Sequence, residues 1–494
     1  MDKFKKTITL LLCCVFAFSL AACNEEGDGM AQKLVEGKYT VTEKGTPVEF
    51  HKLTFDFIGG EDVMPVGGYW GPYQSGGTVN GQILPDLLSE QIYEALADAG
   101  INMIVRSADN ATVRDYAAVE YGLGLAEKYG IGVFTPVSDL EQIAGQRSTY
   151  KAGDPLPFSL NDYQNMIQKF SNYNSFLGVS VTDEPLWNSM DGLKRAFGLF
   201  EEIGFGNEYV SYCNVLGSEN ASFGDSSVDA DMYFDKLFGD IKIPYFSATG
   251  YYYTQKDTPD AQLATLFNAL SSMRSSANAY GIPLWRMLQA GGNWNDSLND
   301  KPSVPVYPNE GELLFDVNIA LAYGCKAIQY FPLVQPSHFA YASGGTYDFH
   351  RNGLIGAAGN KTEWYYYAQK ANKQIAAIDH VLMNAANMGL IAHGDKAVAL
   401  SHSYDSTRTE FLGDSFRQLT SVTGDDCYVG CFDYKGGTAL YVVNYDRNNK
   451  SNVTLNFADN YGYEVIQRAK TAEVMGKSLN LTLECGEGVL VVLK

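Results

Sequence analysis

The sequence predicts an α/β fold, a (β/α)8 barrel followed by a small antiparallel β-sandwich, and three observations support this prediction. Between about residues 60 and 385, short apolar runs alternate with longer stretches whose apolar residues have helical spacing. Several of these stretches end at a glycine, where helices commonly stop in the left-handed conformation. Beyond residue 390, the pattern changes to short alternating strands separated by turn residues.

The expected barrel strands are short, mostly apolar runs. They are Val63–Tyr69, Asn102–Arg106, Gly132–Pro136, Leu177–Thr182, Tyr209–Asn214, Tyr245–Thr249, Leu284–Gln289 and Ala327–Phe331. Eight strands that alternate with helices over about 325 residues match the count of a (β/α)8 barrel. A doubly wound open sheet is the competing arrangement, but no G-x-G-x-x-G or Walker motif follows a strand to support it.

The expected helices repeat apolar residues every three or four positions. They are Leu87–Ala99, Val113–Tyr129, Asp191–Ile203, Ala261–Tyr280 and Glu310–Tyr323. Four glycines follow helical stretches at the place of a left-handed stop, namely Gly100, Gly130, Gly281 and Gly324. Residues 362–389 predict one further long helix, which ends at Gly389.

The C-terminal part predicts an antiparallel sandwich. Its expected strands are Ala397–Leu400, Cys427–Phe432, Ala439–Asn444, Val453–Phe457, Leu479–Leu483 and Gly488–Leu493. The predicted organisation is therefore a signal peptide over residues 1–23, a tether and N-terminal strands over 24–60, the barrel over 61–389 and the sandwich over 390–494.

The start of the chain predicts export. Three lysines at positions 3, 5 and 6 precede an apolar run from Ile8 to Leu20, and the run ends in Leu-Ala-Ala-Cys at residues 20–23. This ending resembles the lipobox of bacterial lipoproteins, in which the cysteine is diacylated and becomes the new N-terminus. The resemblance implies that Cys23 anchors the protein to a membrane of the bacterial cell envelope, on its extracytoplasmic side. An ordinary signal peptide with an incidental cysteine is the alternative.

Composition excludes several functional classes. Apolar residues make up 46% of the 494 residues and charged residues 19%, which is typical of a protein with a large core. The 36 basic and 57 acidic residues give a net charge of −21, which argues against a nucleic-acid partner. The sequence contains no H-E-x-x-H or G-x-S-x-G motif, so we expect neither a zinc centre nor a serine esterase, and no cofactor.

The residues at the ends of the predicted strands indicate the chemistry, because the active site of a (β/α)8 barrel lies at the carboxyl ends of its strands. These ends are rich in aromatic and amide side chains, which stack on pyranose rings and hydrogen-bond to hydroxyl groups. The candidate substrate-binding residues are Tyr69, Trp70, Arg106, Asp139, Tyr212, Tyr251, Gln289, Trp294 and Tyr330. We therefore expect a carbohydrate ligand. Ordinary polar loops are the alternative interpretation.

Two adjacent carboxylates, Asp183 and Glu184, follow the strand Leu177–Thr182 directly. Close like charges raise the pKa of one carboxyl group, which a general acid at neutral pH requires. The run Asp183-Glu184-Pro185 resembles the Asn-Glu-Pro or Asp-Glu-Pro run that ends strand 4 in (β/α)8 retaining glycoside hydrolases. The appended sandwich is also similar to theirs, so the resemblance covers residues 60–494. It implies glycosidic bond hydrolysis with Glu184 as the acid/base. A solvated turn is the plainer interpretation.

The sequence departs from that group at one place. The retaining enzymes have a nucleophilic glutamate at the end of strand 7, where this chain has Gln289, and an amide cannot act as the glycosyl nucleophile. Three explanations stay open. First, Asp183 and Glu184 resemble the pair in barrels that cleave N-acetylhexosaminides, where the aspartate orients the attacking acetamide of the substrate.

Second, another carboxylate acts, with Asp56, Asp109, Asp139, Asp296 and Glu310 as candidates. Glu310 and Glu312 open a predicted helix, however, and the plainer interpretation of both is stabilisation of the helix dipole. Third, the barrel binds a glycan without cutting it, as a non-catalytic surface glycan-binding lipoprotein would.

Overall fold

The computed structural model describes residues 51–74, 82–107, 116–146, 148–206, 208–218, 222–253, 259–291, 308–336, 352–401 and 410–494, together with short strands at 34–35, 41–43, 46–48 and 78–79. Residues 32–494 form one compact unit. The predicted signal peptide and Cys23 lie outside the described residues. Within the described ranges, no helix is both long enough and apolar enough to cross a membrane.

Eight parallel strands form a barrel, which confirms the predicted fold class. They are β5 (Val66–Tyr69), β8 (Met103–Val105), β9 (Gly132–Pro136), β10 (Phe176–Asp183), β11 (Val210–Asn214), β12 (Phe246–Ala248), β13 (Leu284–Gln289) and β14 (Ala327–Phe331). Neighbours in the chain are neighbours in the sheet, and β14 pairs with β5. A parallel bridge between Val215 and Ala248 joins β11 to β12 and closes the barrel.

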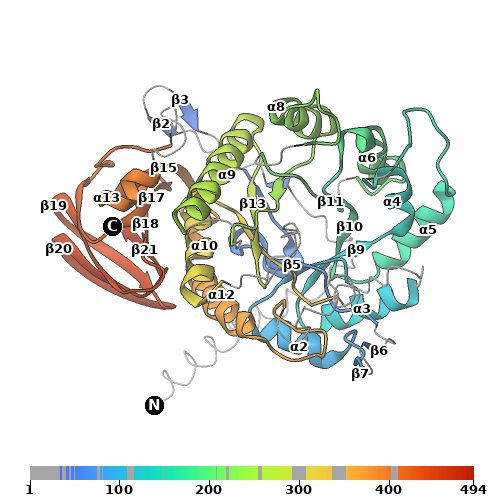
Figure 1. Cartoon of the computed structure of the whole chain (residues 1–494), viewed down its shortest axis with the longest axis horizontal. Helices are drawn as coiled ribbons and strands as arrows, with labels where there is room; N and C mark the ends of the chain where they lie inside the picture. Colours follow the sequence, from blue (N-terminus) through green and yellow to red (C-terminus); the bar gives the residue numbers. More distant parts are fainter. Residues whose placement is uncertain are drawn as a thin grey trace, which may run out of the picture. The chain divides into compact units, whose positions relative to one another are not determined.

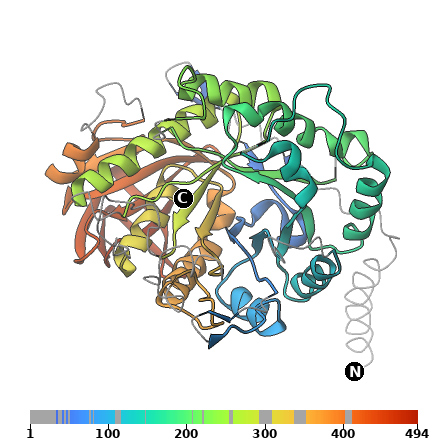
Figure 2. The ribbon, with the colours of Figure 1, turned by 45° about the vertical axis from the view of Figure 1, so that its right-hand side comes forward.

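Helices surround the barrel, as Figures 1 and 2 show. They are α2 (Glu90–Asp98), α3 (Tyr116–Lys128), α4 (Ser138–Ala144), α5 (Leu160–Phe170), α6 (Met190–Phe197), α7 (Leu199–Glu202), α8 (Ala230–Phe234), η4 (Asp235–Ile241), α9 (Pro259–Tyr280), α10 (Glu310–Ala322) and α12 (Glu363–Leu382). The four predicted helix stops are confirmed, because Gly100, Gly130, Gly281 and Gly324 have φ of 77°, 68°, 64° and 89°.

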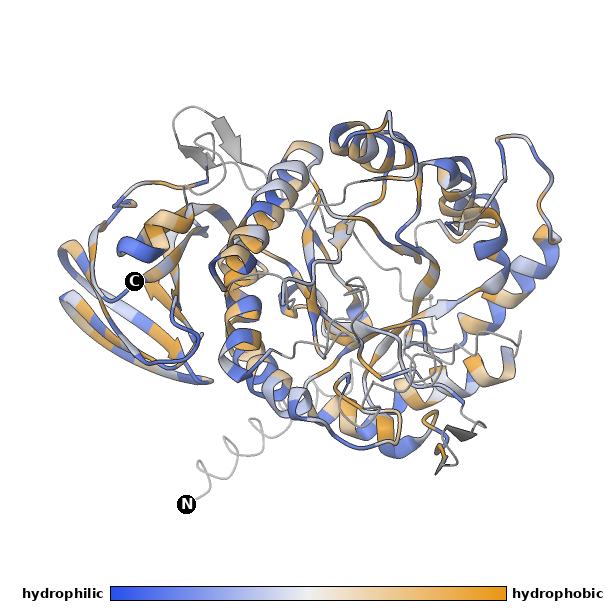
Figure 3. Cartoon of the chain, in the orientation of Figure 1, coloured by the Kyte–Doolittle hydropathy of each residue, from blue (hydrophilic) through white to orange (hydrophobic). Residues whose placement is uncertain are grey.

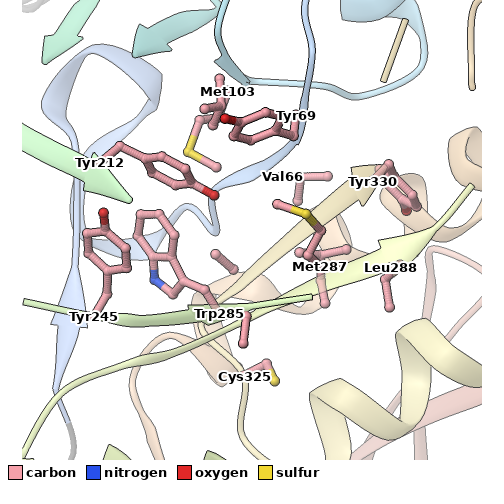
Figure 4. Packing of buried hydrophobic residues seen from close by; sticks show 14 of the residues in the cluster. Val66, Tyr69, Met103, Tyr212, Tyr245, Trp285, Met287, Leu288, Cys325 and Tyr330 are labelled. Atoms are coloured by element: carbon pink, nitrogen blue, oxygen red, sulfur yellow. The ribbon is translucent and has the colours of Figure 1, made fainter. Parts of the chain in front are cut away.

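Aromatic rings fill the middle of the barrel. Trp285 stacks on Tyr245 with ring centroids 4.4 Å apart, and Tyr245 stacks on Tyr212 at 5.7 Å (Figure 4). Phe55 lies 6.3 Å from Trp285, near the amino ends of the strands. The barrel is therefore packed rather than open, and a ligand can reach its residues only from an end.

The C-terminal part is one antiparallel sheet of seven strands that curls around a second core (Figure 1). Its strands are β15 (Ala385–His393), β16 (Leu419–Gly424), β17 (Cys427–Tyr434), β18 (Gly437–Asn444), β19 (Ser451–Gln467), β20 (Lys470–Leu483) and β21 (Gly488–Leu493). Leu440, Val442 and Leu455 belong to this second core, whereas Tyr428 and Tyr441 join the core of the barrel.

The sheet packs on α10, a helix whose residues are nearly all buried and mostly apolar (Figure 3). Tyr441 donates a hydrogen bond to Asn318 Oδ1 at 2.6 Å, and Asn318 Nδ2 donates to the Gly486 carbonyl at 2.8 Å. A Cβ atom on Gly430 would lie 2.6 Å from the carbonyl oxygen of Ala322, so glycine permits this close approach. The sheet and barrel thus share a buried interface.

Two sequence predictions in this region are wrong. The helix expected over 362–389 ends at Leu382, and β15 begins at Ala385, because this segment pairs with β17 and Lys326 Nζ donates to the carbonyls of Leu382 and Ala385. The strand expected at Ala397–Leu400 is part of helix α13 (Asp395–Ser401). The Asp426 carboxylate accepts from the amides of Lys396 and Ala397 and so caps that helix from a distant part of the chain.

Short hairpins precede and interrupt the barrel. Among the described residues, four strands lie before it, in the segment where the sequence predicted N-terminal strands: β1 (Leu34–Val35), β2 (Val41–Glu43), β3 (Thr46–Val48) and β4 (Lys52–Leu53). A further pair, β6 (Thr78–Val79) and β7 (Gln82–Ile83), follows the first barrel strand. In the C-terminal sheet, strand β16 was not predicted. Strands β19 and β20 are longer than the predicted strands Val453–Phe457 and Leu479–Leu483 that lie within them.

Candidate active site

Three residues with positive φ stand at the carboxyl ends of barrel strands. Trp70 follows β5 with φ of 63°, Arg106 follows β8 with 60°, and Glu184 follows β10 with 46°. Such backbone conformations cost about 1–3 kcal/mol each in residues that carry a side chain. The neighbouring strands hold two of them, since the Arg106 amide donates to Phe134 O at 2.9 Å and the Glu184 amide to Asn214 O at 2.8 Å. Three strained backbone positions thus lie at the end of the barrel where the sequence predicts the site.

The Glu184 carboxyl group is partly buried and held in place from a neighbouring part of the barrel. Thr249, just beyond β12, donates a hydrogen bond to Glu184 Oε1 at 2.6 Å. Burial raises the pKa of Glu184, and the hydrogen bond from Thr249 lowers it by a smaller amount. More of this side chain is therefore protonated near neutral pH than of an ordinary glutamate, which a general acid requires.

Asp183 is the last residue of β10 and lies beside Glu184 in the chain. Burial, reinforced by the neighbouring Glu184 carboxylate, raises the pKa of Asp183 to about 7. Asn214 Nδ2 donates to Asp183 Oδ1 at 3.2 Å and favours the charged form. Asp183 and Glu184 therefore both titrate closer to neutrality than isolated carboxyl groups do.

A buried chain of polar side chains supports Asp183 from below. Ser247 Oγ donates to Asn214 Oδ1 at 3.1 Å, and Gln329 Nε2 donates to Ser247 Oγ at 2.9 Å. Tyr212 donates in turn to Gln329 Oε1 at 2.6 Å. The network fixes the orientation of the Asn214 amide and hence of the Asp183 carboxyl group. Tyr212 belongs both to this hydrogen-bond network and to the aromatic stack in the barrel. Its ring is therefore buried below the sugar-binding surface on which the sequence predicted it.

Aromatic side chains line the mouth next to these carboxyl groups. The Phe331 ring lies 5.0 Å from that of Trp70 and 5.3 Å from that of Tyr251, measured between centroids. All three side chains are partly exposed, whereas Tyr69 is buried behind Trp70 at 6.1 Å. Trp70, Phe331 and Tyr251 together can stack on the apolar faces of sugar rings.

Arg106 forms an ion pair with Glu141 of α4, a residue that was not among the candidates predicted from the sequence. Arg106 Nη1 also donates to the Tyr69 hydroxyl at 3.4 Å. The charge of Arg106 lowers the pKa of Asp183 and that of Glu141 raises it, so both groups lie within electrostatic range of the carboxyl pair. The structure thus brings together Tyr69, Trp70, Arg106, Asp183, Glu184 and Tyr251 at one end of the barrel.

Two further predicted substrate-binding residues are buried and hydrogen-bonded to other parts of the chain. Tyr330 donates to Asn372 Oδ1 of α12 at 2.7 Å, and Figure 4 shows it apart from the central ring stack. Side chains alternate along a strand, so the next residue, Phe331, takes the place expected for Tyr330. Gln289 is buried, and its Nε2 donates to the Gly291 carbonyl at 3.0 Å, where it holds the chain after β13.

The other carboxylates proposed from the sequence have separate roles or positions. Asp139 lies in α4 and accepts from Gln142 of the same helix at 3.0 Å. Asp56 is exposed and adjoins Phe55, near the opposite end of the barrel. Glu310 and Glu312 both lie in the first turn of α10, at the helix start that the sequence predicted; Glu310 pairs with Lys370 at 2.6 Å, and Glu312 forms a capping box with Asn309.

Asp109, Asp296 and Trp294 lie outside the described residues. Across the described part of the chain, no group of three or more His, Cys, Asp or Glu side chains could hold a metal ion. Sequence reasoning assigned no role to Thr249, Asn214 or Phe331. Each of the three is the last residue of a predicted strand, and this position in the sequence could have identified them as candidate site residues.

No protein-family model and no curated protein matches the chain. Among solved structures, a GH42 beta-galactosidase from G. stearothermophilus has a TM-score of 0.52 and 9% identity, over 88% of this chain and 98% of its own. A putative alpha-galactosidase from Bacteroides fragilis has a TM-score of 0.45 and 12% identity, over 88% of this chain and 80% of its own. The overall fold is therefore similar to that of the GH42 beta-galactosidase, and the resemblance seen in the sequence is confirmed for the fold, a (β/α)8 barrel with a C-terminal antiparallel sheet.

Proposed function

We propose that this protein is a glycoside hydrolase that cleaves glycosidic bonds in a polysaccharide or host glycan. The observation that carries the proposal is the Asp183–Glu184 pair at the carboxyl end of β10, with raised pKa values and with Glu184 held by Thr249. The aromatic row of Trp70, Phe331 and Tyr251 beside the pair suits a sugar ligand.

In this proposal, Glu184 donates its proton to the leaving glycosidic oxygen as the bond to the anomeric carbon breaks. Gln289 offers no nucleophile, so we propose that an N-acetylhexosaminide supplies its own. The acetamide oxygen bonds to the anomeric carbon while Asp183 accepts from the acetamide N–H. Water then attacks that carbon as its bond to the acetamide oxygen breaks, and the Glu184 carboxylate accepts a proton from the attacking water. The hydrogen bond from Asn214 holds Asp183 for this role.

We further propose that the protein works outside the cytoplasm, attached to a bacterial membrane through a lipid on Cys23. The support is the segment at residues 1–23, with its basic start, apolar run and terminal cysteine. Two acyl chains on one cysteine suffice for stable anchoring.

A second candidate function is glycan binding without cleavage. It is favoured by Gln289, which stands where a retaining hydrolase of this fold needs a carboxylate. In that case, the aromatic row and the polar strand ends would hold a glycan at the mouth of the barrel, and Asp183 and Glu184 would act as hydrogen-bonding groups.

A panel of aryl glycosides that includes N-acetylhexosaminides, together with natural glycans, tests the two candidates. We expect cleavage of at least one substrate and, for Glu184→Gln, a loss on the order of 10²–10⁴ in rate on a natural glycan. On an aryl glycoside with a good leaving group, the loss should be smaller, because that group needs little protonation. Glu473→Gln is the control, since Glu473 is an exposed residue of β20 that pairs with Lys494.

An unchanged rate for Glu184→Gln on every cleaved substrate would overturn the assignment of the acid. If the wild-type protein cleaves nothing but binds one of the glycans in calorimetry, the binding function replaces the hydrolase.

A further inference from the structure

We propose a second binding site, for a sugar that carries a carboxylate or sulfate group, around Arg447 where the C-terminal sheet meets the barrel. That its ligand is a sugar rests on the proposed function, whereas the preference for an anion rests on the side chains described next.

The site is a cavity of about 530 Å³ between α9, α13 and the turn after β18. Its lining residues are Asp260, Lys396, Ala399, Leu400, Tyr445, Asp446, Arg447 and Asn448. Its volume falls within the ~300–1,000 Å³ that is usual for small-molecule sites. Figure 1 shows α13 beside α9, and residues of the two helices are in contact. The wall of the cavity is thus made by both the barrel and the sheet.

Arg447 is the residue that indicates a ligand. Its side chain is nine-tenths buried, and its Nη1 atom has no hydrogen-bond partner in the part of the chain that the structure describes. A buried donor without an acceptor is costly, and a buried guanidinium group more so. Arg447 lines the cavity, and a turn of its guanidinium group toward a carboxylate or sulfate oxygen there would give Nη1 an acceptor and would match the planar guanidinium geometry.

The turn that carries Arg447 is fixed against the barrel. A Cβ atom on Gly311 would lie 1.9 Å from the Arg447 carbonyl oxygen, so the two backbones are closely packed. Asn309 Nδ2 donates to Asn448 Oδ1 at 3.2 Å across the same contact. Because this packing holds the backbone of Arg447, the guanidinium group is placed in advance of binding, which lowers the entropy that a ligand must overcome.

The neighbouring acid, Asp446, is occupied within its own turn. It accepts from the amides of Asn448 and Asn449 at 2.8 and 2.9 Å. Although burial opposes it, these hydrogen bonds keep the pKa of Asp446 below its usual value, so it stays charged without pairing to Arg447. Lys396 adds a second cation to the cavity wall, and Asp260 can accept from hydroxyl groups. An anionic sugar presents both an oxyanion and hydroxyl donors.

The cavity lies at the same end of the barrel as the candidate active site. Its walls include the start of α9 and adjoin the start of α10, the helices that follow β12 and β13. Tyr253, in the segment after β12, donates to Glu312 O at 2.8 Å; burial raises the pKa of Tyr253, and the nearby charge of Arg447 opposes that rise. An acidic glycan would therefore be the substrate class best suited to contact both sites.

Calorimetry on the full-length Glu184→Gln protein tests the proposal, because this variant should cleave a bound glycan more slowly by a factor on the order of 10²–10⁴. The probes are a trisaccharide of uronic acid, its carboxyl-reduced neutral counterpart and inorganic sulfate. We expect the uronate to bind at least tenfold more tightly than the neutral sugar, and Arg447→Gln to abolish that difference. Lys396→Gln should reduce it. Arg468→Gln is the matched control, since Arg468 pairs with Glu487 on the sheet, and it should change nothing.

Equal affinities for the two sugars, or an Arg447→Gln protein that keeps the preference for uronate while unfolding at the wild-type temperature, would overturn the proposal. Sulfate that binds as tightly as the uronate would show a simple anion site and would overturn the sugar assignment. A wild-type protein that cleaves no glycan would reject the hydrolase function but would leave these binding measurements interpretable.

Discussion

Thr249 donates a 2.6 Å hydrogen bond to Glu184 Oε1 and so connects the end of β12 to the end of β10. The contact spans β11, whose Asn214 binds both the backbone amide of Glu184 and the side chain of Asp183. Three consecutive strands thus place two carboxyl groups whose pKa values lie above their usual range.

Thr249→Val keeps the shape of this side chain and removes its hydroxyl donor. That donor lowers the pKa of Glu184, so its loss should raise the pKa further and move the alkaline limb of the pH profile of kcat/KM to higher pH. The profile should be measured on a cleaved substrate for Thr249→Val and for the control Thr265→Val, because the Thr265 hydroxyl donates to Ala261 O within its own helix, α9. If the alkaline limb does not shift, the hydrogen bond from Thr249 does not influence the pKa of the general acid.

Asp183→Asn tests substrate assistance. If Asp183 orients the acetamide, the variant should lose a factor on the order of 10² on both natural and activated N-acetylhexosaminides, because the internal nucleophile is then misplaced. Asp459→Asn, at an exposed position of β19, serves as the control. A loss confined to natural substrates would instead indicate that Asp183 supports proton donation by Glu184.

The same Asp183→Asn change should stabilise the protein at alkaline pH. The pKa of Asp183 is about 7 in the folded state and about 3.9 in an unfolded chain. The protonated Asp183 carboxyl group therefore contributes fully to the free energy of unfolding below about pH 4, and this contribution is lost as the pH rises through 7. Urea unfolding at pH 5 and pH 8 should show the advantage of the variant growing with pH. A constant difference would contradict the raised pKa.

Tyr441→Phe should weaken the contact between the sheet and the barrel. The change removes the donor to Asn318 Oδ1 and leaves a buried acceptor unpaired, which costs about 1–3 kcal/mol. Tyr366→Phe is the control, because Tyr366 is 56% exposed on α12. Denaturant unfolding measures both.

Truncation after Gly389 should have a larger effect, since it cuts through β15 and uncovers the apolar residues of α10. The truncated protein should aggregate or unfold at a lower temperature. A soluble barrel of undiminished stability would show that the sheet is an independent module.

Cys23→Ala tests the proposed anchor. The variant should leave the membrane fraction and appear in soluble or unprocessed form, because the acceptor of the lipid is gone. Mass spectrometry of the wild-type N-terminus provides the direct check, and a mature start other than an acylated Cys23 would reject the anchor.

Local patterns determined most of the barrel from the sequence alone. The predicted strands Gly132–Pro136, Leu284–Gln289 and Ala327–Phe331 have the observed bounds, because each is an apolar run that starts shortly after a helix stop or turn. The Asp183–Glu184 pair was equally visible, since its position at a strand end is a property of neighbouring residues in the chain.

Only the tertiary structure decided which side chains meet. Phe331 rather than Tyr330 joins Trp70, because a shift of one residue along a strand reverses the direction of the side chain. The segment after Asp395 is a helix because Asp426, far along the chain, caps it. Thr249 reaches Glu184, and Glu141 reaches Arg106, only once the barrel has closed. These contacts join residues distant in sequence, and no local periodicity encodes the geometry that brings them together.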